Sequence, residues 1–196
     1  MNRTRFLLLV AALGITSGCA FTPQVVQIQP ELDIAKSNIG GGAVVAVYVV
    51  DERDNKELGR RGTGAMKGAA ITTEQDMATV FSDAIVAGLK DKGFEASAAS
   101  SAAAPGHGAL LRIDIRNIEY ETSMGFWTGG VHVRGSMKGT ASKSGESYDN
   151  FYQIDDEKRV VVVPGADSNA QMINATVSAV IQEMFNDVEL FEFLKN

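Results

Sequence analysis

Cysteine, histidine and tryptophan are scarce in this chain, whose 196 residues include one cysteine, two histidines and one tryptophan. A single cysteine excludes an internal disulfide. His107 and His132 have no neighbouring thiol and no HxH or HxxxH spacing, so neither a metal nor another cofactor is expected. The sequence lacks a Gly-x-Ser-x-Gly elbow, and its glycine-rich stretch 62–68 lacks the Gly-Lys-Ser/Thr that opens a helix in phosphate loops. These absences predict a protein that is not an enzyme.

Positive charge and long apolar runs are also limited. The formal net charge is −6, from 24 acidic and 18 basic residues, which argues against nucleic acid as a partner. The apolar run Phe6–Ile15 is shorter than the roughly 20 residues that a membrane-spanning helix needs.

The residues around that run predict a bacterial lipoprotein signal peptide. Arg3 and Arg5 precede it, and the small residues 16–18 lead to Cys19. Processing attaches a diacylglyceryl group to such a cysteine and cuts the chain before it. An ordinary secretory signal and a short buried helix are the alternatives. Because two or three acyl chains anchor a protein stably, the lipid on Cys19 is the expected contact with the membrane.

The predicted cleavage divides the chain. We expect residues 1–18 to be removed, residues 19–42 to form the lipidated N-terminus, tether and first strand, and residues 43–196 to form a single periplasmic α+β domain. Ala20 follows the cysteine, which favours the outer membrane of a Gram-negative bacterium, on its periplasmic side. Loss of Arg3 and Arg5 lowers the net charge from −6 to −8, so the lipid rather than surface charge must hold the protein.

Apolar and alternating segments predict the strands. Ala43–Val50 is an unbroken β-branched and aromatic run that indicates a strand buried on both faces, and a second strand is expected around Ala69–Thr72. Three further segments alternate with period two, beginning near Leu111, Val131 and Tyr148. Turns at 125–130 and 143–146 separate these three segments, which predicts an antiparallel meander.

Two amphipathic helices are expected. Thr73 is predicted to cap the first, whose apolar stripe runs to Leu89 and which ends at Gly93. Ser168 is predicted to cap the second, and Asp187 a short last helix. The predicted fold is therefore α+β: a mainly antiparallel sheet with two amphipathic helices packed on one face.

Two loops stand out by composition. The stretch 96–108 is rich in alanine, serine and glycine and predicts a mobile loop. Phe126 and Trp127 lie in a glycine-rich turn. Burial in the core is the default for such side chains, but if exposed they are candidate contacts for a partner, the membrane interface or a glycan. Asp155, Asp156 and Glu157 are expected to be solvated charges in a turn.

Several motifs together carry a family resemblance. They are Ser17-Gly18-Cys19, the proline-bounded strand before Pro30, Val47-x-Val49-x-Asp51-x-Arg53 leading to Leu58-Gly59, Phe81-x-x-Ala84-Ile85, Gly93-Phe94, Leu111-x-Ile113 and Phe191-x-Phe193-Leu194-Lys195. With these motifs the chain resembles the YajG family of bacterial lipoproteins. The resemblance implies location and fold and carries over no catalytic residue. Asp51 and Arg53 are expected to form an ion pair that closes the end of the buried strand.

Two functional hypotheses follow. The first is a non-enzymatic outer-membrane lipoprotein that serves as an accessory or interaction component of the cell envelope, with an envelope protein as possible partner. The alternative is a binding module for a small envelope ligand, a glycan fragment or a lipid, held between helices and sheet. An apolar cavity of about 300 Å³ or more favours the second hypothesis.

Overall fold

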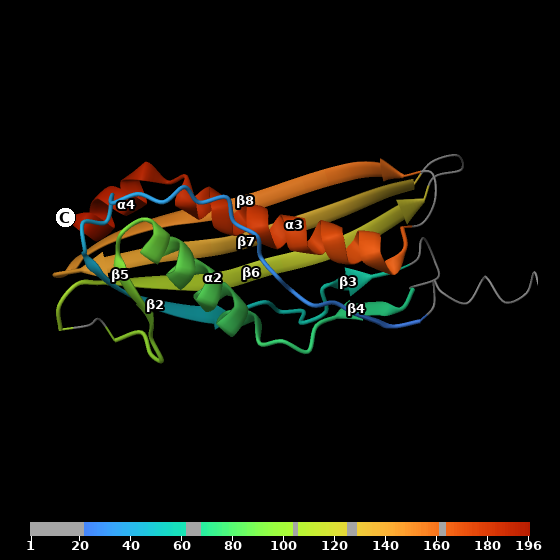
Figure 1. Cartoon of the computed structure of the whole chain (residues 1–196). Helices are drawn as coiled ribbons and strands as arrows, with labels where there is room; N and C mark the ends of the chain where they lie inside the picture. The colour runs from blue at the N-terminus through green and yellow to red at the C-terminus, as the bar shows by residue number, and fades with distance from the viewer. Residues whose placement is uncertain (1–21, 62–67, 104–105, 125–128, 161–163) are drawn as a thin grey trace, which may run out of the picture.

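The computed structural model describes residues 22–61, 68–103, 106–124, 129–160 and 164–196. In chain order the elements are β1 (Gln24–Val25), β2 (Val44–Asp51), β3 (Gly59–Arg60), β4 (Ala70–Thr72), α2 (Met77–Asp91), β5 (Glu95–Ala98), β6 (Ala109–Met124), β7 (Gly129–Lys143), β8 (Glu146–Val160), α3 (Ala166–Phe185) and α4 (Val188–Lys195). The strands form one eight-stranded sheet with the helices on one side (Figure 1).

The long strands β6, β7 and β8 pair antiparallel, which confirms the predicted meander. Ser144 and Gly145 join β7 to β8 with φ values of 53° and 88°. Two positive φ values in succession are typical of a type I′ turn, whose twist matches that of the flanking strands.

The other edge of β6 is shared by β2 and β3, and the prediction of a mainly antiparallel sheet was wrong at this edge. The first half of β6 pairs with β2, and its second half pairs with β3 at Tyr120. Four of the seven strand pairings in the described chain are parallel, so the sheet is mixed rather than mainly antiparallel. Parallel neighbours need a long crossover, which the segment containing α2 supplies between β2 and β5.

A bulge in β6 lies where its two partners change over. The register with β7 shifts between Ile115 and Asn117, so one extra residue is accommodated. Ile113 and Ile115 face the helices before the bulge, and Ile118 and Tyr120 face them after it; all four are buried. A bulge bends its strand, which lets β2 and β3 occupy the same edge of β6 in turn.

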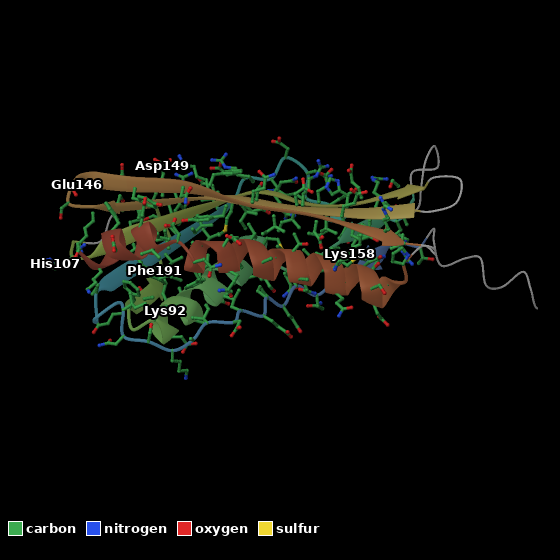
Figure 2. The ribbon with its side chains drawn as sticks, turned by 90° about the horizontal axis from the view of Figure 1, so that it is seen from above. Lys92, His107, Glu146, Asp149, Lys158 and Phe191 are labelled. Atoms are coloured by element: carbon green, nitrogen blue, oxygen red, sulfur yellow. The ribbon has the colours of Figure 1, made fainter. Side chains whose placement is uncertain are left out.

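Three helices in the described chain cover one face of the sheet: the two predicted amphipathic helices and the predicted short last helix, which packs on the same face (Figure 2). α2 lies over β2 and β5, α3 over β6 to β8, and α4 over β7 and β8. Asp187 caps α4 as predicted, accepting a hydrogen bond from the Leu190 backbone N–H at 3.1 Å. Gly93 follows α2 with φ 85°, as predicted.

The starts of α2 and α3 differ from the prediction. Asp76, rather than Thr73, caps α2 by accepting from Ala78 N. Thr73 Oγ1 instead accepts from Gln75 N at 3.2 Å in the preceding turn. α3 begins two residues before Ser168 and has Gly165 as its N-cap, without a side-chain hydrogen bond.

Three strand predictions also need correction. In β2 only the helix side is buried, since Val44 is 40% exposed. The stretch 96–108, predicted as a loop, begins inside β5, which pairs parallel with β2. Asp155, Asp156 and Glu157 lie within β8 rather than in a turn.

Residues 22–34, part of the segment predicted as a tether, run along α3. Val26 and Ile28 are almost fully buried. The backbone N–H groups of Gln29, Glu31 and Asp33 donate to polar side chains spaced four residues apart on α3, namely Asn174, Ser178 and Gln182. Because four residues make about one helical turn, this ladder fixes the segment parallel to the helix axis.

Candidate functional site

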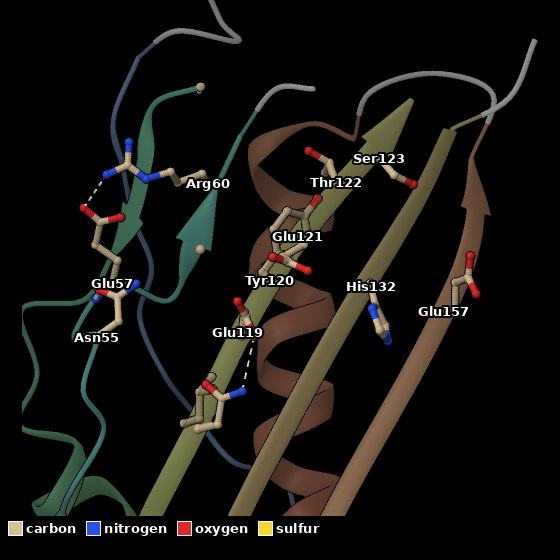
Figure 3. A pocket seen from close by; sticks show the side chains of 14 residues that line it. Asn55, Glu57, Arg60, Glu119, Tyr120, Glu121, Thr122, Ser123, His132 and Glu157 are labelled. Carbon is tan, nitrogen blue, oxygen red and sulfur yellow. Dashed lines mark hydrogen bonds and ion pairs between the residues drawn. The ribbon is translucent and has the colours of Figure 1, made fainter. Parts of the chain in front are cut away.

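A polar groove of about 510 Å³ lies on the open face of the sheet, where β3 meets the second half of β6 (Figure 3). Its floor is formed by side chains of β6, β7 and β8, and its wall by the segment that leads into β3. The polar side chains that line it are Asn55, Glu57, Arg60, Asn117, Glu119, Glu121, Thr122, Ser123, His132 and Glu157.

The alternation of the strands places these side chains together. The register sets Glu121 opposite His132, and His132 opposite Glu157. One step along, Glu119 lies opposite Arg134 in the same way, and Arg134 opposite Asp155. The first row lies in the groove floor, and the second, of which Glu119 lines the groove, runs beside it; each row has a basic side chain between two carboxylates.

Ion pairs hold the two rows in place. Arg134 Nη2 forms an ion pair with Glu119 Oε2 at 2.9 Å and donates to Glu121 Oε2 at 3.0 Å. His132 Nε2 contacts Asp155 Oδ1 on the diagonal. The carboxylates that line the groove are those of Glu57, Glu119, Glu121 and Glu157, against the basic side chains of Arg60 and His132, so the groove carries excess negative charge. A groove of this kind attracts cationic groups.

Gly59 brings the wall of the groove close to its floor. Its φ is +152°, and a Cβ at this position would lie 2.2 Å from the carbonyl oxygen of Tyr120. A side chain here would push β3 away from β6. In the wall, Arg60 Nη2 donates to Glu57 Oε1 at 2.9 Å.

A second open groove, of about 770 Å³, lies at the other end of the sheet between β8 and the junction of α3 with α4. Asp187 organises it. Its carboxylate accepts hydrogen bonds from the hydroxyls of Tyr148 and Tyr152 and from the amide of Asn150. Phe151 and Val188, 52% and 68% exposed, also line the groove.

The electrostatics around Asp187 favour a structural role. Burial by itself raises its pKa, but the donors from Asn150, Tyr152 and Tyr148, with the Leu190 N–H, hold the pKa below its ordinary value. Burial and the bonded carboxylate raise the pKa of Tyr148 to about 12 and that of Tyr152 further. Both phenols therefore stay protonated and serve as donors rather than as bases.

The predicted pair Asp51–Arg53 is present. Arg53 Nε donates to Asp51 Oδ1 at 2.8 Å, and the Arg53 side chain is only 3% exposed. Burial raises the pKa of Asp51, but the hydrogen bonds and charge of Arg53 outweigh it and leave the pKa below the ordinary value. The pair closes the end of β2, as expected.

Cys19, Phe126 and Trp127 lie outside the described residues, as does most of the glycine-rich stretch 62–68. His132 alternates outward as predicted and lines the first groove. The sequence analysis missed this groove. Its signal was the alternation of Glu119 and Glu121 with the apolar Ile118 and Tyr120, but the face that they take depends on the bulge, and their partners depend on a register that only the folded sheet shows.

Neither a metal cluster nor a membrane span was found in the part of the chain described. No group of three or more histidine, cysteine or acidic side chains there is placed to hold a metal ion. None of the helices there combines the length and the hydropathy needed to cross a bilayer.

Three solved structures match parts of the chain, with TM-scores from 0.36 to 0.52. A protein from Xanthomonas campestris assigned to the DUF330 family is 12% identical with a TM-score of 0.52, and the match covers 88% of this chain and 96% of that one. A putative neuraminyllactose-binding hemagglutinin homolog from Helicobacter pylori is 12% identical with a TM-score of 0.49, over 87% and 97% of the two chains. Lipoprotein GNA1162 from Neisseria meningitidis is 16% identical with a TM-score of 0.36, over 74% and 99%.

At this level of identity the first likeness shows the fold alone, and the two lower TM-scores carry no argument. No curated protein matches the chain. A family model described as "Uncharacterized lipoprotein" matches residues 30–195, which is most of the sequence and nearly all of the described structure. The chain therefore belongs to the lipoprotein family Lipoprotein_16.

Proposed function

We propose that this chain is a non-enzymatic lipoprotein of the outer membrane, anchored through Cys19 on the periplasmic side, whose folded domain binds a protein partner of the cell envelope. The signal-like segment 1–18 and the membership of a lipoprotein family support the anchor. The YajG resemblance supports the same location.

The polar groove on the open face is the observation that carries the binding role. Pockets for small molecules are mostly enclosed and lined by apolar side chains. This groove is open and lined mainly by charged and amide side chains, with one acid–base–acid row on its floor and a second row beside it. Such a surface suits a peptide segment with lysine or arginine side chains, which pair with carboxylates and steer the encounter.

Photocrosslinking in intact cells tests the groove. A photoreactive amino acid replaces Glu121 in the groove or, as the matched control, Gln171 on the exposed side of α3. We expect a defined protein adduct from position 121 that is absent from position 171. Replacing Glu119 and Glu157 by glutamine should weaken that adduct, because the partner loses its countercharge.

Other outcomes contradict the proposal. The same adducts from positions 121 and 171 would show that the groove is not the binding surface. Recovery of only lipid, together with a metabolite bound to the purified chain, would favour the small-ligand module.

The anchor has its own test. Labelled palmitate should enter the wild-type chain and not the Cys19→Ala variant. Label that survives this substitution rules out a lipid on Cys19.

A further inference from the structure

The chain is fixed to the folded body from the first described residue. Buried Arg61, 8% exposed, donates from Nη1 to the carbonyl oxygen of Thr22 at 3.4 Å. Two residues on, Gln24 Nε2 donates to the carbonyl oxygen of Ala166 at 2.7 Å, and its Oε1 accepts from Asn169 Nδ2 at 3.1 Å. Thr22 therefore has a set position relative to the sheet and α3.

Thr22 lies at one end of the long axis of the molecule. The register places the end of β6, the start of β7 and the end of β8 side by side at Met124, Gly129 and Val160. α3 begins at this same end (Figure 1). We call it the anchor end; the far end holds the turn at Ser144 and the last residue, Asn196.

The short link to Cys19 determines which end can meet the membrane. Only three residue steps separate Cys19 from Thr22, and a fully extended chain spans at most about 11 Å in three steps. The 15 residues of β7 extend about 50 Å. A lipid on Cys19 thus reaches the anchor end only. We propose that the domain stands upright on the phospholipid bilayer, with the anchor end against the headgroups; this rests on the lipid anchor of the proposed function.

Charge on the open face opposes a domain lying flat on that face. The groove floor presents Glu119, Glu121 and Glu157, and the chain carries a net charge of −8 once residues 1–18 are removed. Close contact with headgroups would strip water from these carboxylates and from the ion-paired side chains of Arg112, Arg134 and Lys138 on the same face. An upright domain keeps this face in water.

Lipid-headgroup quenching tests the orientation in the full lipidated chain. Cys19 is the only native cysteine and is blocked by its lipid, so an introduced cysteine carries the fluorophore alone. Ser123→Cys and Ser147→Cys are matched sites, both exposed and on the open face. Their β7 neighbours, Gly130 and Ser142, are 12 residues apart, which corresponds to about 40 Å.

The labelled proteins are inserted into vesicles of phosphatidylethanolamine and phosphatidylglycerol that carry a nitroxide on the headgroup. We expect fluorescence to be lost at position 123 and kept at position 147. A Gly/Ser linker inserted after Ala20 should restore fluorescence at position 123, because the body can then leave the surface.

Vesicle flotation distinguishes a failure of the upright orientation from a failure of the lipid anchor. Equal loss at both sites, or a greater loss at position 147, in protein that floats with the vesicles overturns the upright orientation and leaves the anchor intact. Protein that fails to float, or a Cys19→Ala variant that floats equally well, overturns the anchor and the orientation with it.

Discussion

The two faces of β7 carry different kinds of side chain, although their residues alternate along one strand. Towards the helices the strand presents Val131, Val133, Met137 and Ala141, none more than 3% exposed. Its small residue Gly135 lets α3 approach, since a Cβ there would lie 3.0 Å from Thr176 Cγ2. Towards the open side it presents polar residues that pair across strands.

The difference shows which face supplies the stability. Removal of apolar surface from water is worth about 25 cal/mol per Å², whereas exposed ion pairs contribute about 0–1 kcal/mol each. The helix side therefore holds the fold together. The open side is free to vary its charges, so a binding surface can lie there at small cost to folding.

The sharpest contrast is between two neighbours on β7. Met137→Ala leaves a cavity under the helices and should lower the free energy of unfolding by about 2–5 kcal/mol. Lys138→Ala, on the open face, should change it by less than about 0.5 kcal/mol. Urea denaturation of both variants measures the contrast, and equal losses would refute it.

The next largest loss of unfolding free energy is expected from breaking a buried hydrogen bond on the helix side. Tyr120 donates from its hydroxyl to Asn169 Oδ1 at 2.7 Å, and burial raises its pKa to about 12 although Arg61 opposes the shift. Tyr120→Phe leaves the Asn169 oxygen without this donor and should cost about 1–3 kcal/mol. Tyr48→Phe, on the open face, is the control and should cost less than about 0.5 kcal/mol. A similar loss from both would contradict the assignment.

Asp187 tests a charge held on the helix side. Asp187→Ala removes the cap of α4 and should cost about 1–2 kcal/mol. Because the folded pKa is below the ordinary 3.8, the charged form stabilises the fold above that value, and this contribution is lost as the pH falls below it.

The contribution of the Asp187 charge to stability is measured by the unfolding midpoints of wild type and Asp187→Asn as a function of pH. We expect their difference to be constant near neutral pH and to shrink in acid. A difference that grows in acid would mean that folding raises the pKa of Asp187 instead of lowering it.

The smallest effect is expected on the open face. A double-mutant cycle of Arg134→Ala and Glu119→Ala should give a coupling of about 0.2–1 kcal/mol that weakens as salt is added. A coupling that is large and insensitive to salt would mean that the groove floor is more shielded from water than its exposure indicates.

Periodicity in the sequence was sufficient for the local elements. The apolar stripe from Met77 to Leu89 predicted α2, and Asp187 predicted the cap of α4. The alternation beginning near Leu111 and Val131 predicted two strands of the meander. These features depend on neighbours within one or two turns, so the local pattern determines them.

Strand direction and register required the folded chain. An alternating segment has the same pattern beside a parallel or an antiparallel neighbour, so the pairing of β2 with β6 was missed. The bulge after Ile115 changes which alternate residues face the helices, and it places Glu119 and Glu121 outward. The rows of the groove floor combine residues more than ten positions apart, and no local pattern joins them.

The firm hold on Thr22 bears on how a partner would be met. With a lipid on Cys19, the body would drift in two dimensions with the bilayer and keep the polar groove at a nearly constant height. A partner confined to the same membrane would then search a plane instead of a volume, which raises its effective concentration. A partner diffusing freely between the membranes would gain no such advantage, so the length of this link selects among partners before any contact forms.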